Sequence, residues 1–214
     1  MPRMNAADAL TCLREGNRRF VTEGHASDAP TGHDRRRELL AGQKPVAIVL
    51  GCSDSRVPLE LIFDQGLGDL FVIRVAGNIV APSQVASVEF AAERLAVRLV
   101  VVLGHTACGA ITATVEELES PRPSRSPNLP SIVDRIRPAV LPLLQTELRH
   151  DRKALICAAG RANVKSSADH LRHGSPVLEE LIRDHGLLVV GAEYSLESGI
   201  VDFFDGVPLS GSGA

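Results

Sequence analysis

The apolar positions along the chain follow two alternating patterns. Short continuous apolar runs, typical of strands buried on both faces, lie at 46–51, 70–74, 98–104, 186–194 and 199–204. Helical periodicity is expected between and around them, at 5–22, 33–41, 83–97, 107–119, 131–149, 152–173 and 176–185. Alternation of strands and helices predicts an α/β fold with a mostly parallel central β-sheet flanked by helices.

The length of 214 residues predicts a single domain spanning 1–214. Within it, residues 1–42 are expected to form a helical arm, and the Pro/Ser-rich stretch 120–130 is expected to be a loop. The net charge of −3 gives no bulk electrostatic case for nucleic acid or an anionic membrane as a partner. No apolar run is long enough to span a membrane.

The compartment is predicted from the N-terminus and the cysteines. The first 20 residues lack an uninterrupted apolar segment, so a signal peptide is not expected. The four cysteines are too scattered for a disulfide scaffold and are interpreted as reduced thiols of a cytoplasmic protein. Cys12 and Cys157 are expected to be small buried hydrophobic residues.

Metal-ligating side chains follow two of the predicted strands. Cys52 comes directly after the run at 46–51, His105 comes directly after the run at 98–104, and Cys108 is three residues further on. If these strands are neighbours, the three side chains converge at the carboxyl edge of the sheet. Two thiolates and one imidazole are a favoured ligand set for zinc, with one position left for another ligand.

The role of the carboxylate nearest to Cys52 is open at this point. Asp54 and Arg56 can form a bidentate ion pair, which leaves the fourth zinc position to water. Alternatively, Asp54 binds the metal and closes the site. A third interpretation is a salt bridge that orders the loop and has no catalytic part.

Two segments carry a family resemblance. "CSDSRVP" at 52–58 and "GHTACGA" at 104–110 resemble the β-class carbonic anhydrases of bacterial type, which are zinc enzymes. "EGNRRFV", "FDQGLGDLFVIRVAGN" and "GAEYSLESGIVDF" are also similar to the family, so the resemblance covers most of the chain. It implies one Zn²⁺ per chain on Cys52, His105 and Cys108. It also implies a catalytic dyad of Asp54 and Arg56, with Asp54 as a fourth ligand only in a closed state.

The resemblance also implies a substrate pocket and an assembly. Gln43 matches a residue that hydrogen-bonds substrate, and Gly109 matches a position whose backbone N–H faces the zinc-bound group. Phe71, Ala76 and Phe90 match apolar pocket positions, with Phe90 reaching across from a second subunit. A homodimer or homotetramer is implied, in which the N-terminal arm packs on the partner subunit. The implied reaction is the reversible hydration of carbon dioxide to bicarbonate and a proton, by attack of zinc-bound hydroxide.

One departure from the family bears on regulation. Some bacterial members have a second, inhibitory bicarbonate site built from Trp, Arg and Tyr. Arg74 and Tyr194 match two of these residues, but the chain has no tryptophan and Val49 stands in its place. Arg74 and Tyr194 are therefore expected to make interfacial or structural hydrogen bonds.

Two alternative functions remain at this stage. One is hydrolysis of a related heterocumulene, carbon disulfide or carbonyl sulfide, on the same scaffold. The other is a non-catalytic zinc-binding module in which Asp54 permanently completes the tetrahedron. A purely structural site does not require Gln43, Asp54 and Arg56 together, so the intact set favours an enzyme.

Overall fold

The computed structural model describes residues 4–23, 32–120 and 126–208. One sheet of five strands has the order β2-β1-β3-β4-β5. Its strands are β1 (Ala47–Gly51), β2 (Leu70–Arg74), β3 (Leu99–His105), β4 (Leu188–Tyr194) and β5 (Val201–Asp205). The first four are mutually parallel, and β5 pairs antiparallel with β4. The predicted α/β fold with a mostly parallel sheet is confirmed.

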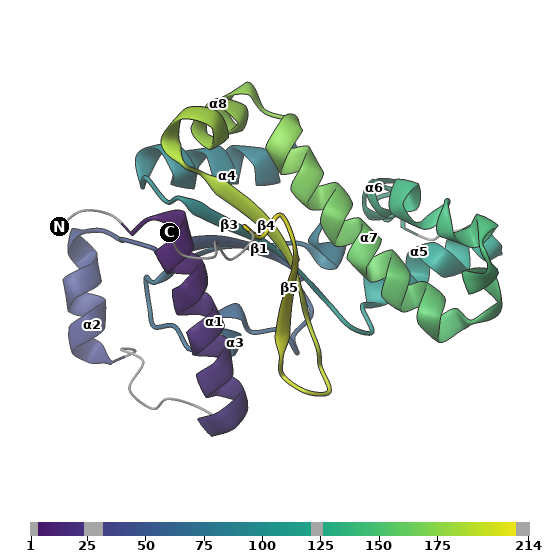
Figure 1. The fold of residues 1–214 in the computed structure, drawn as a ribbon, viewed down its shortest axis with the longest axis horizontal. Coiled ribbons are helices and arrows are strands. Elements are labelled where there is room, and N and C mark those ends of the chain that lie inside the picture. Colours follow the sequence, from purple (N-terminus) through teal and green to yellow (C-terminus); the bar gives the residue numbers. More distant parts are fainter. Residues whose placement is uncertain (1–3, 24–31, 121–125, 209–214) are drawn as a thin grey trace, which may run out of the picture.

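The helices form layers on the two faces of this sheet. The α-helices are α1 (Ala6–Glu23), α2 (His33–Glu38), α3 (Leu59–Ile62), α4 (Pro82–Arg94), α5 (Gly109–Glu119), α6 (Pro130–Val140), α7 (Arg152–His173) and α8 (Pro176–His185). The 3₁₀ helices are η1 (Leu39–Ala41), η2 (Ala76–Asn78), η3 (Leu143–Gln145) and η4 (Glu147–His150). Figure 1 shows α1 and α3 on one side of the sheet, with α4, α7 and α8 on the other.

Strand β1 is apolar or glycine throughout, and β3 is so from Leu99 to Gly104, because both faces of these central strands are covered. In β1, Val49 packs in the core on the side of α1, whereas Ile48 and Leu50 pack on the side of α4 and α7. All three are 0% exposed. Burial of such side chains contributes about 1.5–3 kcal/mol each, so strands β1 and β3 are rigid supports for the residues at their ends.

A glycine brings the long helix α7 against the sheet. A Cβ placed at Gly104, near the end of β3, would lie 2.5 Å from the side chain of Val164 in α7. Only glycine allows this approach without a shift of the helix. The carboxyl end of β3 and the middle of α7 are thereby held in a fixed relation.

The structure differs from the predicted helices at two places. The helix expected at 131–149 ends at Val140 and is followed by η3 and η4. Pro142 explains the break, because its ring lacks an N–H and clashes with the preceding turn. The short helix α3 was not predicted. Of the predicted loop at 120–130, residues 121–125 lie outside the described part of the chain.

The N-terminal helix covers its own chain. Leu10 and Leu13 of α1 are buried in the core, and Asn17 Nδ2 donates to the carbonyls of Ile62 and Gly199. By contrast, η1 has no buried residue, and Leu40 in it is 87% exposed. Packing of the arm on a partner subunit therefore stays a prediction. Among the described residues, no helix combines the length and hydropathy needed to cross a membrane.

Candidate metal centre

The metal-ligating side chains are positioned by two neighbouring parallel strands. β1 pairs with β3, and Gly51 lies opposite Leu103. Cys52 follows the end of β1, and His105 is the last residue of β3. The chain leaves β1 toward β2 on one side and reaches β3 on the other, so the carboxyl ends of β1 and β3 flank the switch point of the sheet. Crevices at such points are the usual ligand sites of open α/β sheets.

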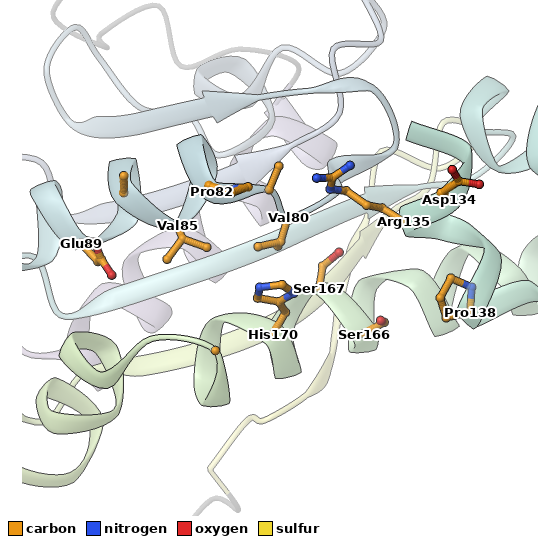
Figure 2. A pocket seen from close by; sticks show the side chains of 13 residues that line it. Val80, Pro82, Val85, Glu89, Asp134, Arg135, Pro138, Ser166, Ser167 and His170 are labelled. Carbon is orange, nitrogen blue, oxygen red and sulfur yellow. The ribbon is translucent and has the colours of Figure 1, made fainter. Parts of the chain in front are cut away.

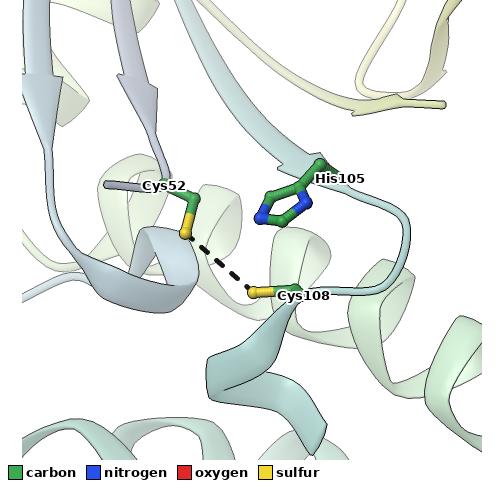
Figure 3. Close-up of side chains that lie close together, drawn as sticks. All are labelled: Cys52, His105 and Cys108. Atoms are coloured by element: carbon green, nitrogen blue, oxygen red, sulfur yellow. Dashed lines mark hydrogen bonds between the residues drawn. The ribbon is translucent and has the colours of Figure 1, made fainter. Parts of the chain in front are cut away.

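Cys52, His105 and Cys108 form one buried cluster. Their possible ligand atoms all lie within 4.8 Å of one another, and the two sulfurs are 4.0 Å apart. In Figure 3 the His105 ring points from the end of its strand toward both sulfurs. Nε2 of His105 is buried and has no hydrogen-bond partner in the described structure. A buried nitrogen and two thiols facing one point fit a tetrahedral zinc ion with one open position.

The tautomer of His105 suits a metal ligand. Its Nδ1 lies 2.9 Å from the backbone carbonyl oxygen of Thr106. A carbonyl only accepts, so Nδ1 carries the proton and donates to it, which leaves the lone pair of Nε2 facing the sulfurs.

The pKa values of the two thiols shift in opposite directions. The hydrogen bond from Cys108 lowers the pKa of Cys52 to about 4 against the opposing effect of burial. The backbone N–H of Gly77 also donates to the Cys52 sulfur, at 3.3 Å. The pKa of Cys108 is raised by its hydrogen bond with Cys52 and by burial. A soft cation would displace the remaining proton, because thiolates are the metal-binding form.

Asp54 is held by Arg56 beside this cluster. Nε and Nη2 of Arg56 donate to the two carboxylate oxygens at 2.9 and 2.7 Å, and the backbone N–H of Arg56 donates at 3.0 Å. This bidentate contact holds the pKa of Asp54 well below its usual range. Oδ2 of Asp54 lies 3.8 Å from Nε2 of His105. The carboxylate thus stands beside the cluster, bonded to the guanidinium.

A cavity of about 830 Å³ adjoins the centre. Arg56, His105 and Cys108 line it together with the apolar side chains of Ile111 and Ile156. It reaches the cluster from the side of α5, α7 and the loop between β4 and β5. Its largely apolar wall suits a small uncharged molecule.

The predicted substrate residues are only partly assembled in one chain. Gly109 is the first residue of α5, directly after Cys108, and Ala76 precedes the Gly77 N–H that contacts Cys52. Phe71 and Phe90 lie with ring centroids 6.3 Å apart, and Phe90 is 52% exposed. None of Ala76, Phe71 and Phe90 lines the 830 Å³ cavity.

Gln43 lies far from the cluster in its own chain. It is exposed and precedes the amino end of β1, whereas Cys52 follows the carboxyl end of the same strand. The five residues of β1 separate these ends by about 3.3 Å each. The structure of one chain therefore does not bring Gln43 to the metal centre.

A second hollow lies away from the metal centre. This groove of about 670 Å³ runs between α4, α6 and α7 (Figure 2). Glu89, Arg135, Ser167 and His170 line it, and none of the predicted site residues does. The hydroxyl of Ser167 is already bonded to the carbonyl of Asn78. The groove adds nothing to the metal site.

Several contacts of the site were not predicted from the sequence. They are the Gly77 N–H on the Cys52 sulfur and the Thr106 carbonyl on His105. Arg74 makes structural hydrogen bonds, as expected, but their acceptors, the carbonyls of Cys52 and Asp54, were not predicted. The glycine of the "AGN" segment was the available signal for the Gly77–Cys52 contact, because Gly77 has a φ of 70°, in the left-handed region that favours glycine. Cys157, expected to be buried, is exposed in α7 and lines the 830 Å³ cavity.

Comparisons with known proteins identify the family. The family described as carbonic anhydrase matches residues 47–201. Carbonic anhydrase 2 of Mycobacterium tuberculosis is 37% identical over 204 residues, 93% of each chain. A crystal structure of a β-carbonic anhydrase of Aspergillus fumigatus gives a TM-score of 0.73 at 28% identity, covering 95% of this chain and 92% of that chain. One of two tetrameric β-carbonic anhydrases of Sordaria macrospora gives 0.71 at 27% identity, covering 79% and 85%.

These findings decide between the functions left open by the sequence. Neither heterocumulene hydrolysis nor a non-catalytic zinc module is favoured, since the relatives are carbonic anhydrases by name over nearly the full chain. The Cys52, His105 and Cys108 cluster is suited to the zinc ion on which β-carbonic anhydrases depend. The chain therefore belongs to the β-class carbonic anhydrases, zinc enzymes that reversibly hydrate carbon dioxide to bicarbonate and a proton.

Proposed function

We propose that Cys52, His105 and Cys108 hold the catalytic zinc and that Asp54 and Arg56 form the catalytic pair. The observation that carries this assignment is the convergence of three ligand atoms within 4.8 Å beside a carboxylate that a guanidinium holds in a bidentate contact. Because Arg56 engages both oxygens of Asp54, the carboxylate is retained beside the cluster and the fourth metal position is left open.

The residues of this chain have distinct parts in the reaction. Zinc bound here would lower the pKa of a water molecule toward about 7 and so supply a nucleophile at neutral pH. Asp54 accepts a hydrogen bond from that nucleophile and orients it, while Arg56 keeps the carboxylate ionised and in place. We assign to the N–H of Gly109, the first residue of α5, a donor role toward the developing bicarbonate oxygen. Carbon dioxide is apolar and needs only a dry wall beside the nucleophile.

Asp54→Asn tests the assigned role of the carboxylate. The amide has the shape of the carboxylate but only one accepting oxygen and no charge. We expect zinc to stay at about one per chain, as three ligands remain, while hydration measured by stopped flow falls by about 100-fold or more. Unchanged activity would remove Asp54 from the catalytic pair.

We also propose a homodimer or a homotetramer in which a second copy completes the substrate pocket. Three observations support it: Leu40 is 87% exposed, Phe90 is 52% exposed, and Gln43 lies at the opposite end of β1 from its own metal centre. The related Sordaria macrospora enzymes are tetrameric. In such an assembly, Gln43, Phe71 and Phe90 of one copy face the metal centre of the other.

Complementation between two inactive variants tests this arrangement. A dimer of Asp54→Asn with Gln43→Ala has one site that combines the intact Asp54 of the second chain with the intact Gln43 of the first. We expect the co-expressed pair to regain activity that neither variant has alone. No gain over the two parents would show that each chain uses its own Gln43.

We further propose that the enzyme works in the cytoplasm. All four cysteines are free in the structure, and two of them form the metal cluster. Such thiols remain available to zinc in a reducing compartment. Fluorescence of a tagged chain in fractionated cells would test the location.

A further inference from the structure

Arg74 is the last residue of β2, the neighbour of β1, and its side chain reaches the loop that follows β1. Nε donates to the carbonyl oxygen of Cys52 at 2.9 Å, and Nη2 donates to that of Asp54 at 2.6 Å. One rigid guanidinium therefore bridges a zinc-ligand residue and a residue of the catalytic pair. In the register of the sheet Arg74 lies opposite Gly51, so its backbone is fixed where it can reach both carbonyls.

The guanidinium of Arg74 makes its hydrogen bonds to the loop that follows β1. Among the described residues, no carboxylate forms an ion pair with Arg74. The carbonyl of Asp54 also accepts from the N–H of Val57 at 3.0 Å, which closes the turn that contains Arg56. The backbone on both sides of Ser53 is thus fastened to β2 by a planar, always charged group.

The position of the Asp54 carboxylate depends on this loop. Oδ2 lies only 3.8 Å from Nε2 of His105, so a small rotation of the backbone around Ser53 would move the carboxylate into the space on which the ligand atoms converge. Arg56 holds the side chain of Asp54, but Arg56 belongs to the same loop and reaches outside it through a long hydrogen bond from Nη2 to the Ala107 carbonyl, at 3.4 Å. Arg74 is the partner from outside the loop that contacts the backbone of Asp54 itself.

We propose that Arg74 is a positioning residue that holds the Asp54 backbone in the open arrangement and thereby keeps the fourth metal position free. The inference rests on the assignment of the metal ligands and of Asp54 made above. It predicts that loss of the two carbonyl hydrogen bonds lets Asp54 compete for the metal, with zinc still bound. A merely structural arginine would lower stability without changing what the metal can bind.

Arg74→Lys is the informative variant, because lysine keeps the charge but cannot span two carbonyls with a fixed fork. Arg98→Lys is its matched control. Arg98 Nη1 also donates to two backbone carbonyls, those of Ala92 and Val97. Arg98 precedes the amino end of β3, however, whereas Arg74 is at the carboxyl end of β2. Both variants replace a guanidinium that donates to two backbone carbonyls, so a difference between them reports the location of Arg74.

The measurement is titration of the cobalt(II)-substituted protein with azide, followed by its visible absorption spectrum at fixed pH. Azide needs an open metal position, so its affinity reports competition by Asp54. We expect wild type and Arg98→Lys to bind azide alike, and Arg74→Lys to bind it about tenfold more weakly or worse. The double variant Arg74→Lys with Asp54→Asn should recover the azide affinity of Asp54→Asn alone, because the competing carboxylate is gone.

Each result is decisive. Equal azide affinity in Arg74→Lys and wild type, or a loss that Asp54→Asn does not restore, would overturn the positioning role. If Arg74→Lys fails to fold, the comparison of Arg74→Gln with Arg98→Gln applies the same criterion. If the wild-type cobalt protein lacks the charge-transfer absorption of cobalt–thiolate bonds, the metal-site assignment fails instead. If it has that absorption but does not respond to azide, the wild-type site is closed and the positioning role fails, so the two failures are distinguishable.

Discussion

The carboxylate of Asp54 lies 3.8 Å from the unpartnered Nε2 of His105 while both of its oxygens are bonded to Arg56. This single relation is the basis for the proposed open arrangement. It also means that the same carboxylate is close enough to compete for the metal if its partner is removed.

Removal of Arg56 should close the site. In Arg56→Ala the carboxylate loses its bidentate partner, so we expect Asp54 to bind the metal and hydration to fall by about 100-fold or more. Zinc measured by plasma emission should stay at about one per chain, as all ligands remain. The matched control is Arg183→Ala, which breaks the exposed Arg183–Asp184 pair and should leave activity unchanged. Near-normal activity in Arg56→Ala would mean that the Asp54–Arg56 pair only orders the loop and has no catalytic part.

Removal of one thiol should release the metal. Cys108 is buried and its sulfur is one of the three converging atoms, so Cys108→Ser should lose most of its zinc after dialysis against a weak chelator. Cys157→Ser is the control, since Cys157 is exposed and outside the cluster. Full zinc retention in Cys108→Ser would exclude Cys108 as a ligand.

Protonation of Asp54 should not cause the loss of activity on the acid side of the pH profile. Arg56 lowers the pKa of the folded carboxyl below that of the unfolded chain, which is about 3.9. The ion pair therefore stabilises the fold above about pH 3.9 and is lost only as the pH falls through the lower, folded pKa. Activity should decline toward about pH 6 through protonation of the metal-activated water, with Asp54 still charged.

Carbon-13 NMR of the side-chain carboxylates tests this assignment of the titrating group. The Asp54 signal, identified by its absence in Asp54→Asn, should not titrate between about pH 8 and about pH 5. If this signal titrates together with the loss of activity, protonation of Asp54, and not of the water, causes the decline at low pH.

The oligomer should depend on Leu40 and Phe90, two of the exposed apolar side chains. Light scattering of the wild type should give the mass of two or four chains. Leu40→Glu combined with Phe90→Glu places charges on side chains that are 87% and 52% exposed, and the mass should fall toward one chain with the fold retained. Leu141→Glu, on an exposed leucine after α6, is the control and should keep the wild-type mass. An unchanged mass in the double variant would place the interface elsewhere.

Much of the fold and of the cluster is predictable because it follows from strand ends. Strand β1 and residues 99–104 of β3 are apolar or glycine at every position, and Cys52 and His105 come at their carboxyl ends. Adjacent parallel strands then bring the side chains together without help from distant loops. The helix break after Val140 was missed because Leu143, Leu144 and Leu148 continue the amphipathic pattern, although they pack from 3₁₀ turns.

Other features depend on geometry that the sequence does not carry. Arg74 is a long side chain whose acceptors are the carbonyls of a turn, and their direction is set by the folded backbone. Helix α3 has four residues, fewer than two turns, so no periodicity marks it. Gln43 is assigned to a substrate role by resemblance alone, because within one chain it precedes the amino end of β1, whereas the metal centre lies at the carboxyl end of that strand.

The most direct test of the account is stopped-flow hydration of carbon dioxide by the zinc-loaded protein at about pH 8, with Asp54→Asn and Arg56→Ala run in parallel at equal zinc content. The account predicts fast hydration by the wild type and losses of about 100-fold or more in both variants. Hydration by the wild type no faster than by either variant would contradict the assignment of Cys52, His105, Cys108, Asp54 and Arg56 as the catalytic centre.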